Sequence, residues 1–522
     1  MHGTIGRTLA MAWLAGFGTA LAAAEAGFSP CSAHIDIASY LPGGSHEDPD
    51  VAATNAEVDA EFQAALGQWE TAPPQDRYHQ IQLLGKLILF DKTLSVNKTQ
   101  ACTSCHAPRT GFTGGSSLFN QTIVAQPGAV PITNAGGGKP TYRIASRKPQ
   151  TYGYAPFAPI LHFNATQGEF YGGNFWDMRA SGLRLGNPAA EQALGPPTNP
   201  LEMGLPDPAC LVRRIAQSPY RGLFEQVWGA QSFAIHWPAE VDSVCATPGP
   251  APANDPLPVH LSDADRAIAT TSYDHAVMAI AQYEAGPEES PFSSKFDYAL
   301  AHPDQPVLSR DELAGWALFR GKGRCNTCHL DGTASGQRRR ASIEPKAAAD
   351  LRPLFTDFTA SNLGLPKNLA LPFYCENTPD QFGFTANPAG FGYTDLGVGG
   401  FLRGPNNPNP DWVKLASQFD GKFRVPTLRN VDKRPRPDFV KAYMHNGYLK
   451  SLKEVVHFYN TRDVLARCPQ GSPGEKVSCW PAPEVPQTMD TTIGNLGLTD
   501  KEEDQIVAFL KTLTDGYVPP PR

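Results

Sequence analysis

The stretch Cys102-Thr103-Ser104-Cys105-His106 decides the fold, and the same pattern occurs again at Cys325-Asn326-Thr327-Cys328-His329. This spacing is typical of covalent haem attachment in c-type cytochromes. Each cysteine can form a thioether with one haem vinyl group, and the adjacent histidine can then bind the iron as its proximal ligand. A single such pentapeptide also fits a zinc or redox site, but two in one chain favour haem. The sequence therefore predicts two covalently bound haem c groups.

Length, composition and charge limit the classes of protein to which the chain can belong. The chain has 522 residues, among them 48 glycines and 49 prolines, so we expect modest helices joined by many turns and long connections. Its length favours two to three domains. The formal net charge is −7, and the chain contains neither a basic patch nor a long charge run. This pattern argues against nucleic acid as a partner.

The N-terminus has the features of a secretory signal peptide over residues 1–24. Arg7 supplies a positive charge, an apolar run follows from Leu9 to Leu21, and small residues at 22–24 offer a cleavage site. The run is short for a membrane span, and no later run is long enough. An uncleaved anchor is the alternative. We therefore expect a periplasmic protein with no membrane span after the signal is removed.

Cysteine usage agrees with an oxidising compartment. Of the ten cysteines, four belong to the haem motifs, and the other six are an even number, as expected for disulfides. Six cysteines allow fifteen pairings. Our hypothesis is that Cys210–Cys245 and Cys468–Cys479 each close a surface loop.

The order of segments predicts two units. Residues 25–75 lack clear periodicity and are interpreted as an N-terminal extension, whereas a helical pattern begins at Tyr78. Residues 206–228 and 263–284 have the pattern of amphipathic helices, and the Pro-rich stretch 250–258 between them is the best domain boundary. Residues 313–319 repeat the pattern that precedes the first haem motif, which indicates an internal duplication. We therefore predict one domain at 76–258 and another at 259–522, with a terminal helix near 498–510.

Several further segments, taken in order, resemble the bacterial di-haem cytochrome c peroxidase/MauG family. They are Leu84–Ser95, Phe175–Ala180, Glu191–Pro196, Asn199–Met203, Phe423–Asn430 and Tyr443–Gly447. The resemblance covers roughly residues 80–515. It implies an all-α fold of two cytochrome c-like haem domains with long loops and insertions. It also implies that hydrogen peroxide reacts at one haem while electrons enter through the other.

The resemblance assigns roles to individual residues. Glu202 matches the family's catalytic glutamate, Gln192 its distal glutamine and Pro196 the proline that shapes the same pocket. Such a glutamate moves a proton between the two peroxide oxygens, and burial raises the pKa of a carboxyl in that position. Without the family, Glu202 is better interpreted as a solvated loop acid. Trp176 matches the inter-haem tryptophan that relays electrons, although a tryptophan is also a common core residue.

Three departures from the family bear on mechanism, and the first of them makes the first haem resemble that of MauG-like members. Many di-haem peroxidases carry a histidine that blocks the first iron, but no histidine lies between His106 and Arg147. His162 is expected to be a packed histidine. The family binds calcium partly through an asparagine after this arginine, whereas here Lys148 follows it, so calcium is doubtful. Relatives that oxidise a partner protein have a surface tryptophan two residues before the second motif, where this chain has Gly323.

The distal ligand of the second haem has two candidates. In the family it lies seven residues beyond the leucine that opens the helix after a His-x-Gly turn, and counting from Leu452 gives Tyr459. Met444 precedes that turn and is expected to pack. We therefore predict iron coordination by His329 and Tyr459, with a core tyrosine as the alternative interpretation of Tyr459. A phenolate favours higher-valent iron, whereas a thioether raises the potential.

Three functions compete. The leading one is a periplasmic peroxidase that reduces hydrogen peroxide at the first haem with electrons from a small redox protein, either a cytochrome c or a cupredoxin. The second is a MauG-like enzyme that uses the same chemistry to oxidise tryptophan or tyrosine side chains of a protein substrate. The third is a di-haem electron carrier without a substrate. A dioxygen-using relative that cleaves an organic substrate is a remote fourth.

Overall fold

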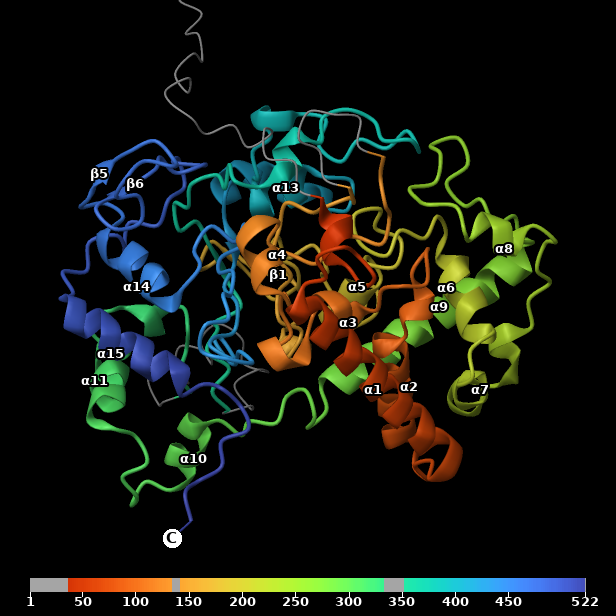
Figure 1. The fold of residues 1–522 in the computed structure, drawn as a ribbon, viewed down its shortest axis with the longest axis horizontal. Coiled ribbons are helices and arrows are strands. Elements are labelled where there is room, and N and C mark those ends of the chain that lie inside the picture. Colours follow the sequence, from red (N-terminus) through yellow and green to blue (C-terminus); the bar gives the residue numbers. More distant parts are fainter. Residues whose placement is uncertain (1–35, 134–140, 333–351, 522) are drawn as a thin grey trace, which may run out of the picture.

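The structure, a computed structural model, describes residues 36–133, 141–332 and 352–521. The expected signal segment, 1–24, lies outside these residues. The first half contains helices α1 (Pro49–Thr71), α2 (Arg77–Phe90), α3 (Cys102–Cys105), α4 (Ser117–Thr122), α5 (Pro188–Ala193), α6 (Pro208–Ala216), α7 (Arg221–Trp228), α8 (Val241–Val244) and α9 (Asp263–Glu284). The second half contains α10 (Lys295–Ala301), α11 (Arg310–Arg320), α13 (Gly397–Arg403), α14 (Leu452–Thr461) and α15 (Asp500–Lys511). Figure 1 shows α11, α14 and α15 at one end of the molecule and α6, α7 and α9 at the other.

The first core forms where α9 packs against α2, α5 and α6, with α1 against the other side of α2. Asp76 starts α2 as its N-cap, accepting from the backbone N–H of His79, and Ser262 caps α9 in the same way. Gly85 allows α2 and α9 to approach closely, because a Cβ there would lie 2.0 Å from the carbonyl oxygen of Ala279. This packing holds the segment that carries the first haem motif.

The second core repeats the arrangement with α11 against α15 and α14 beside it. Capping boxes begin both main helices, Ser309 with Glu312 in α11 and Thr499 with Glu502 in α15. Gly315 is the counterpart of Gly85, since its Cβ would lie 1.8 Å from the carbonyl oxygen of Gln505. The duplication expected from the sequence is therefore visible as two similar helix pairs, and in each pair the first helix precedes the haem motif.

The fold is mostly helical, so the all-α expectation holds in part, with short strand pairs in addition to the helices. Three two-stranded pairings occur among the described residues: β1 (His162–Asn164) with β2 (Glu169–Tyr171), β3 (Ala360–Ser361) with β4 (Phe423–Arg424), and β5 (Ala466–Arg467) with β6 (Cys479–Trp480). The first two pairs are antiparallel and the third is parallel. They fasten long loops and form no layer of their own. Within the described ranges, no helix combines the length and apolar character needed to cross a bilayer.

Two segments differ from the predicted organisation. The expected extension at 25–75 contains α1, a 23-residue helix that Asp48 caps and whose Val58 and Ala65 enter the first core. The predicted boundary at 258/259 places α9 in the second unit, yet α9 packs in the first core. The Pro-rich stretch is a loop within the first unit, and the two cores divide between α9 and α10.

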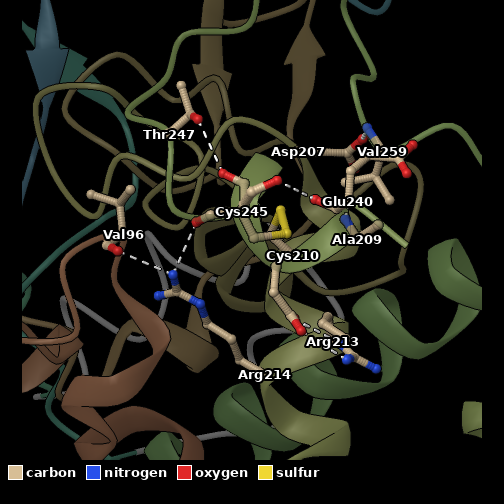
Figure 2. The surroundings of a disulfide bond; sticks show 12 residues. Val96, Asp207, Ala209, Cys210, Arg213, Arg214, Glu240, Cys245, Thr247 and Val259 are labelled. Carbon is tan, nitrogen blue, oxygen red and sulfur yellow. Dashed lines mark hydrogen bonds and ion pairs between the residues drawn. A yellow bond between two sulfur atoms is a disulfide. The ribbon is translucent and has the colours of Figure 1, made fainter. Parts of the chain in front are cut away.

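Both predicted disulfides are present. Cys210–Cys245 joins α6 to the residue that follows α8, and Cys468–Cys479 links the segments of β5 and β6. Figure 2 shows Arg214 beside the first disulfide, where its guanidinium donates to the carbonyls of Val96 and Cys245 at 3.1 and 3.0 Å. Cys375 is also disulfide-bonded. Cys210 and Cys245 are both buried members of the first core, so the bridge between them lies inside the core rather than in a surface loop.

Candidate functional site

The first haem motif lines a cavity in the first core. Cys102, Cys105 and His106 border it, and Gln192, Pro196 and Glu202 border the same cavity. The remaining lining is mainly apolar and comes from α2, α6 and α9: Ile88, Leu89, Leu211, Val277 and Ile280. The structure therefore brings together the residues that the resemblance assigns to one site. Among the lining residues, His106 is the sole histidine in the part of the chain that the structure describes.

His106 is oriented as an iron ligand requires. Its Nδ1 lies 3.1 Å from the carbonyl oxygen of Phe112, and since a carbonyl only accepts, Nδ1 carries the hydrogen. Nε2 is then the nitrogen suited to bind a metal, and the carbonyl fixes the ring and its tautomer. Burial lowers the pKa of His106 to about 4, which keeps the imidazole neutral.

Glu202 is held by two neighbouring groups. The Asn199 side chain donates from Nδ2 to Glu202 Oε1 at 2.6 Å. Burial raises the pKa of Glu202, while the positive charge of Arg179 and the Asn199 hydrogen bond oppose that rise. A carboxyl with a raised pKa is better suited than an ordinary glutamate to take up and release a proton during a reaction.

An alternating chain of charges runs from this pocket toward the second half. Arg179 lies over the ring of Phe175 and donates to both carboxylate oxygens of Asp177 at 2.9 and 2.8 Å. Asp177 also accepts from Arg147 at 2.7 Å, and Arg147 makes two 2.7 Å hydrogen bonds to Asp395. Because each charge has an opposite neighbour, the chain is electrostatically balanced although largely buried.

The second haem motif lines a separate and larger cavity. Cys325 begins a short 3-10 helix, Cys325–Thr327, and borders this cavity together with Cys328 and His329. His329 Nδ1 donates to the carbonyl of Phe355 at 2.9 Å, so the proximal histidines of both motifs are fixed in the same way. Both cavities thus offer two thiol side chains and an oriented imidazole, the donor set that haem c needs.

Both candidate distal ligands line the second cavity. Tyr459 projects from α14, and burial raises its phenol pKa. Met444 lies in the turn before that helix, with a left-handed φ of 67°. The structure therefore places the two side chains in one cavity, and Tyr459 remains the prediction.

Trp176 borders the second cavity and is 9% exposed. Its indole Nε1 donates to the carbonyl of Lys148 at 2.8 Å, and its ring lies edge-on to His445 with 6.4 Å between centroids. His162 borders neither cavity and lies in β1, stacked on Tyr171. Within the described ranges, no group of three or more His, Cys, Asp or Glu side chains is arranged to hold a metal ion.

Two residues beside Glu202 were missed by sequence reasoning. Asn199 belongs to the motif quoted for Glu202, but an asparagine before a proline more often indicates a turn than an orienting group. Arg179 follows Trp176 by three residues, and nothing in the sequence shows that its charge reaches the pocket of Glu202. The segment between Arg179 and Glu202, which contains α5, hides the relationship.

Comparison with known proteins agrees with this architecture. The model of the di-haem cytochrome c peroxidase family matches residues 79–305, a span that runs past the predicted boundary at 258 and includes α9. The methylamine utilization protein MauG of Paracoccus denitrificans is 30% identical over 464 residues, 87% of this chain and 93% of that protein. A cytochrome-c peroxidase of Denitromonas iodatirespirans is 25% identical, covering 83% and 80% of the two chains.

A solved structure extends the likeness to three dimensions. The diheme peroxidase BthA from Burkholderia thailandensis matches with a TM-score of 0.58 and 26% identity, over 85% of this chain and 87% of that one. Relatives of these kinds share haem c cofactors and peroxidase-type chemistry as a family. The chain belongs to the di-haem cytochrome c peroxidase/MauG family and is an oxidoreductase of the di-haem cytochrome c peroxidase type.

Proposed function

We propose that this protein reduces hydrogen peroxide to water in the first cavity, with electrons delivered through the second. The observation that carries the proposal is that Glu202, Gln192 and Pro196 line the same cavity as His106. A binding site for peroxide needs an iron face without a protein ligand, and no second histidine among the described lining residues competes for that face.

Each residue has a task in this cavity. A haem bound there supplies the redox chemistry that cleaves the O–O bond. The Glu202 carboxylate accepts the proton of the oxygen nearer the haem and returns it to the far oxygen, so that water can leave. Asn199 holds the carboxylate in place through its 2.6 Å hydrogen bond to Oε1. Gln192, on α5, offers an amide that can orient the bound peroxide.

Electron delivery uses the second half. Cys325 and Cys328 would attach the haem and His329 would bind its iron, with Tyr459 as the distal ligand. Trp176, which borders this cavity, is the side chain suited to relay electrons toward the first. We propose a small cytochrome c or cupredoxin as the donor. The disulfides Cys210–Cys245 and Cys468–Cys479 support a periplasmic location, because disulfides persist in oxidising compartments.

A second candidate is MauG-like oxidation of tryptophan or tyrosine in a protein substrate. It is favoured by Tyr459, because a hard anionic ligand stabilises oxidised iron and makes the haem a poor acceptor from an ordinary cytochrome. The 30% identity to MauG points the same way.

One experiment separates the candidates. Purified oxidised protein is mixed with one equivalent of hydrogen peroxide while the haem absorption spectrum is followed, and reduced cytochrome c is then added. If the protein is a peroxidase, its haem spectrum changes on addition of peroxide and the added reduced cytochrome c is then oxidised. If it is a MauG-like enzyme, the haem spectrum changes but the added cytochrome c stays reduced. An unreactive spectrum would contradict both and leave the electron-carrier function.

A further inference from the structure

Two cations that line the second cavity, Arg424 and Lys148, have no carboxylate partner among the described residues and few hydrogen bonds from their charged groups. Arg424, in β4, is 6% exposed, and its Nε has no hydrogen-bond partner. No described carboxylate forms an ion pair with its guanidinium, whose nearest aromatic contact is the ring of Phe358 at 5.8 Å. Desolvation alone lowers the pKa of Arg424 to about 10. An arginine buried without a partner is costly, because charged groups lose their hydration on burial.

Lys148 is half-buried and is also poorly satisfied. It borders the same cavity, and the hydrogen bond formed by its ammonium goes to the carbonyl of the adjacent Pro149, at 3.0 Å. No described carboxylate pairs with it. Desolvation lowers its pKa to about 8. Both side chains therefore carry a positive charge that the described part of the chain does not neutralise.

The other cations nearby each form several hydrogen bonds, unlike Arg424 and Lys148. Arg147 pairs with Asp177 and Asp395 at 2.7 Å. Arg429 donates to both oxygens of Asp297. Lys441 donates to three backbone carbonyls. Arg424 and Lys148 are thus less well satisfied than these three cations, since Arg424 Nε has no hydrogen-bond partner and the Lys148 ammonium has one.

The backbones of these two residues each form a hydrogen bond with Trp176. Its indole Nε1 donates to the carbonyl of Lys148 at 2.8 Å, and its own carbonyl accepts from the backbone N–H of Arg424 at 2.8 Å. The two cations and the tryptophan therefore belong to one local structure. The first cavity offers no equivalent, since no Lys or Arg appears among its described lining residues.

We propose that Arg424 and Lys148 bind the propionate carboxylates of the haem attached at Cys325 and Cys328. A haem carries two such carboxylates, so two cations match them in number and sign. A guanidinium forms strong charge-assisted hydrogen bonds with a carboxylate, and an ammonium serves as a compact point charge. The pair anchors the second haem to the backbone that holds Trp176. This inference needs only haem in the second cavity, so it stands or falls separately from peroxide reduction.

The consequence is electrostatic. A positive charge beside a haem stabilises the ferrous state relative to the ferric state, which carries one more positive charge. Removing either cation should therefore lower the reduction potential of the second haem. The first haem, whose cavity lacks the pair, should keep its potential in the Arg424 variant and serves there as an internal reference, whereas the charge of Lys148 also reaches His106.

The test is redox titration of the holoprotein, monitored by haem absorption and electron paramagnetic resonance. The variants are Arg424→Gln and Lys148→Gln, with Arg424→Lys to retain the charge and Lys414→Gln as a control for an exposed cation. We expect both glutamine variants to lower the potential of the second haem, Arg424→Gln without a change at the first haem, and Arg424→Lys and Lys414→Gln to match the parent protein. Loss of only the second haem in Arg424→Gln, restored in Arg424→Lys, would support the proposal equally.

Two results would overturn it. One is an unchanged potential of the second haem in both glutamine variants at full haem content. The other is a parent potential that shifts with added chloride or acetate, because the cations would then be binding a free anion in place of the propionates.

Discussion

Asn199 donates a 2.6 Å hydrogen bond to Oε1 of Glu202, and Oε2 of that carboxyl has no partner among the described residues. One oxygen is thus fixed while the other is available to a ligand in the cavity that both haem-binding cysteines border. This is the geometry expected of a positioned acid–base group. Asn199→Ala should therefore slow the peroxide reaction without changing haem content, and equal rates in the two proteins would show that the bond has no positioning role.

The peroxide reaction should depend on the protonation of Glu202. Burial raises the pKa of Glu202, and only the carboxylate can accept the peroxide proton. The rate should therefore fall as the pH drops through this raised pKa, with a midpoint above that of an ordinary glutamate. Because the charge of Arg179 lowers this pKa, Arg179→Met should move the midpoint to higher pH. Stopped-flow rates across pH give the midpoint. Arg184→Met, which removes an exposed arginine paired with Asp274, should leave it unchanged; equal shifts in both variants would contradict a specific effect of Arg179.

The oxidised protein should contain one high-spin ferric haem. His106 is the one histidine among the described residues that border the first cavity, so no second imidazole is available to occupy the other face of that iron. Low-temperature electron paramagnetic resonance should show a high-spin signal before any reduction. Two low-spin signals and no high-spin signal would show that another side chain caps the iron.

Tyr459 should be the distal ligand of the second haem. Both Tyr459 and Met444 border the cavity, but a phenolate favours ferric iron whereas a thioether raises the potential. Tyr459→Phe should change the spectrum of the second haem, and Met444→Ala should leave it unaltered. A methionine-to-iron charge-transfer band that survives Tyr459→Phe and disappears in Met444→Ala would identify the methionine as the ligand.

Close helix packing predicts a stability contrast between two glycines. Gly315→Ala would place a Cβ 1.8 Å from the carbonyl of Gln505, so α11 and α15 must separate, at a cost of about 1–3 kcal/mol in the free energy of unfolding. Gly67 lies in α1 with open space around it, so Gly67→Ala should stabilise that helix by about 0.5–1 kcal/mol. Denaturant unfolding of the holoprotein measures both. A stabilising Gly315→Ala would show that the helices are not in close contact.

Local patterns predicted local structure well. The apolar periodicity at 263–284 predicted α9 with its observed bounds, and both named disulfides are present. The segment 206–228 is split into α6 and α7, because Pro219 interrupts the hydrogen bonding of a single helix. The apolar periodicity identified the buried faces of both helices but could not show where α6 ends and α7 begins.

Long-range relationships were harder to predict. The Pro-rich stretch at 250–258 indicated a loop correctly, but a loop need not separate two cores, and α9 completes the first one by packing on α2. Motif resemblance brought Glu202, Gln192 and His106 into one hypothesis, and they border one cavity. Arg424 and Lys148 are far apart in the sequence. Their lack of carboxylate partners can therefore be recognised only from the positions of the neighbouring side chains in the structure.

The most direct test of the account is the rate at which hydrogen peroxide reacts with the oxidised protein and with Glu202→Gln. General acid–base transfer is typically worth about 10²-fold or more, so the variant should react at least that much more slowly while retaining two haems and the spectrum of the parent protein. Glutamine keeps the shape of the side chain and can still bond to Asn199, which isolates the loss of proton transfer. An unaltered rate in Glu202→Gln would contradict the proposal that this carboxyl moves the peroxide proton.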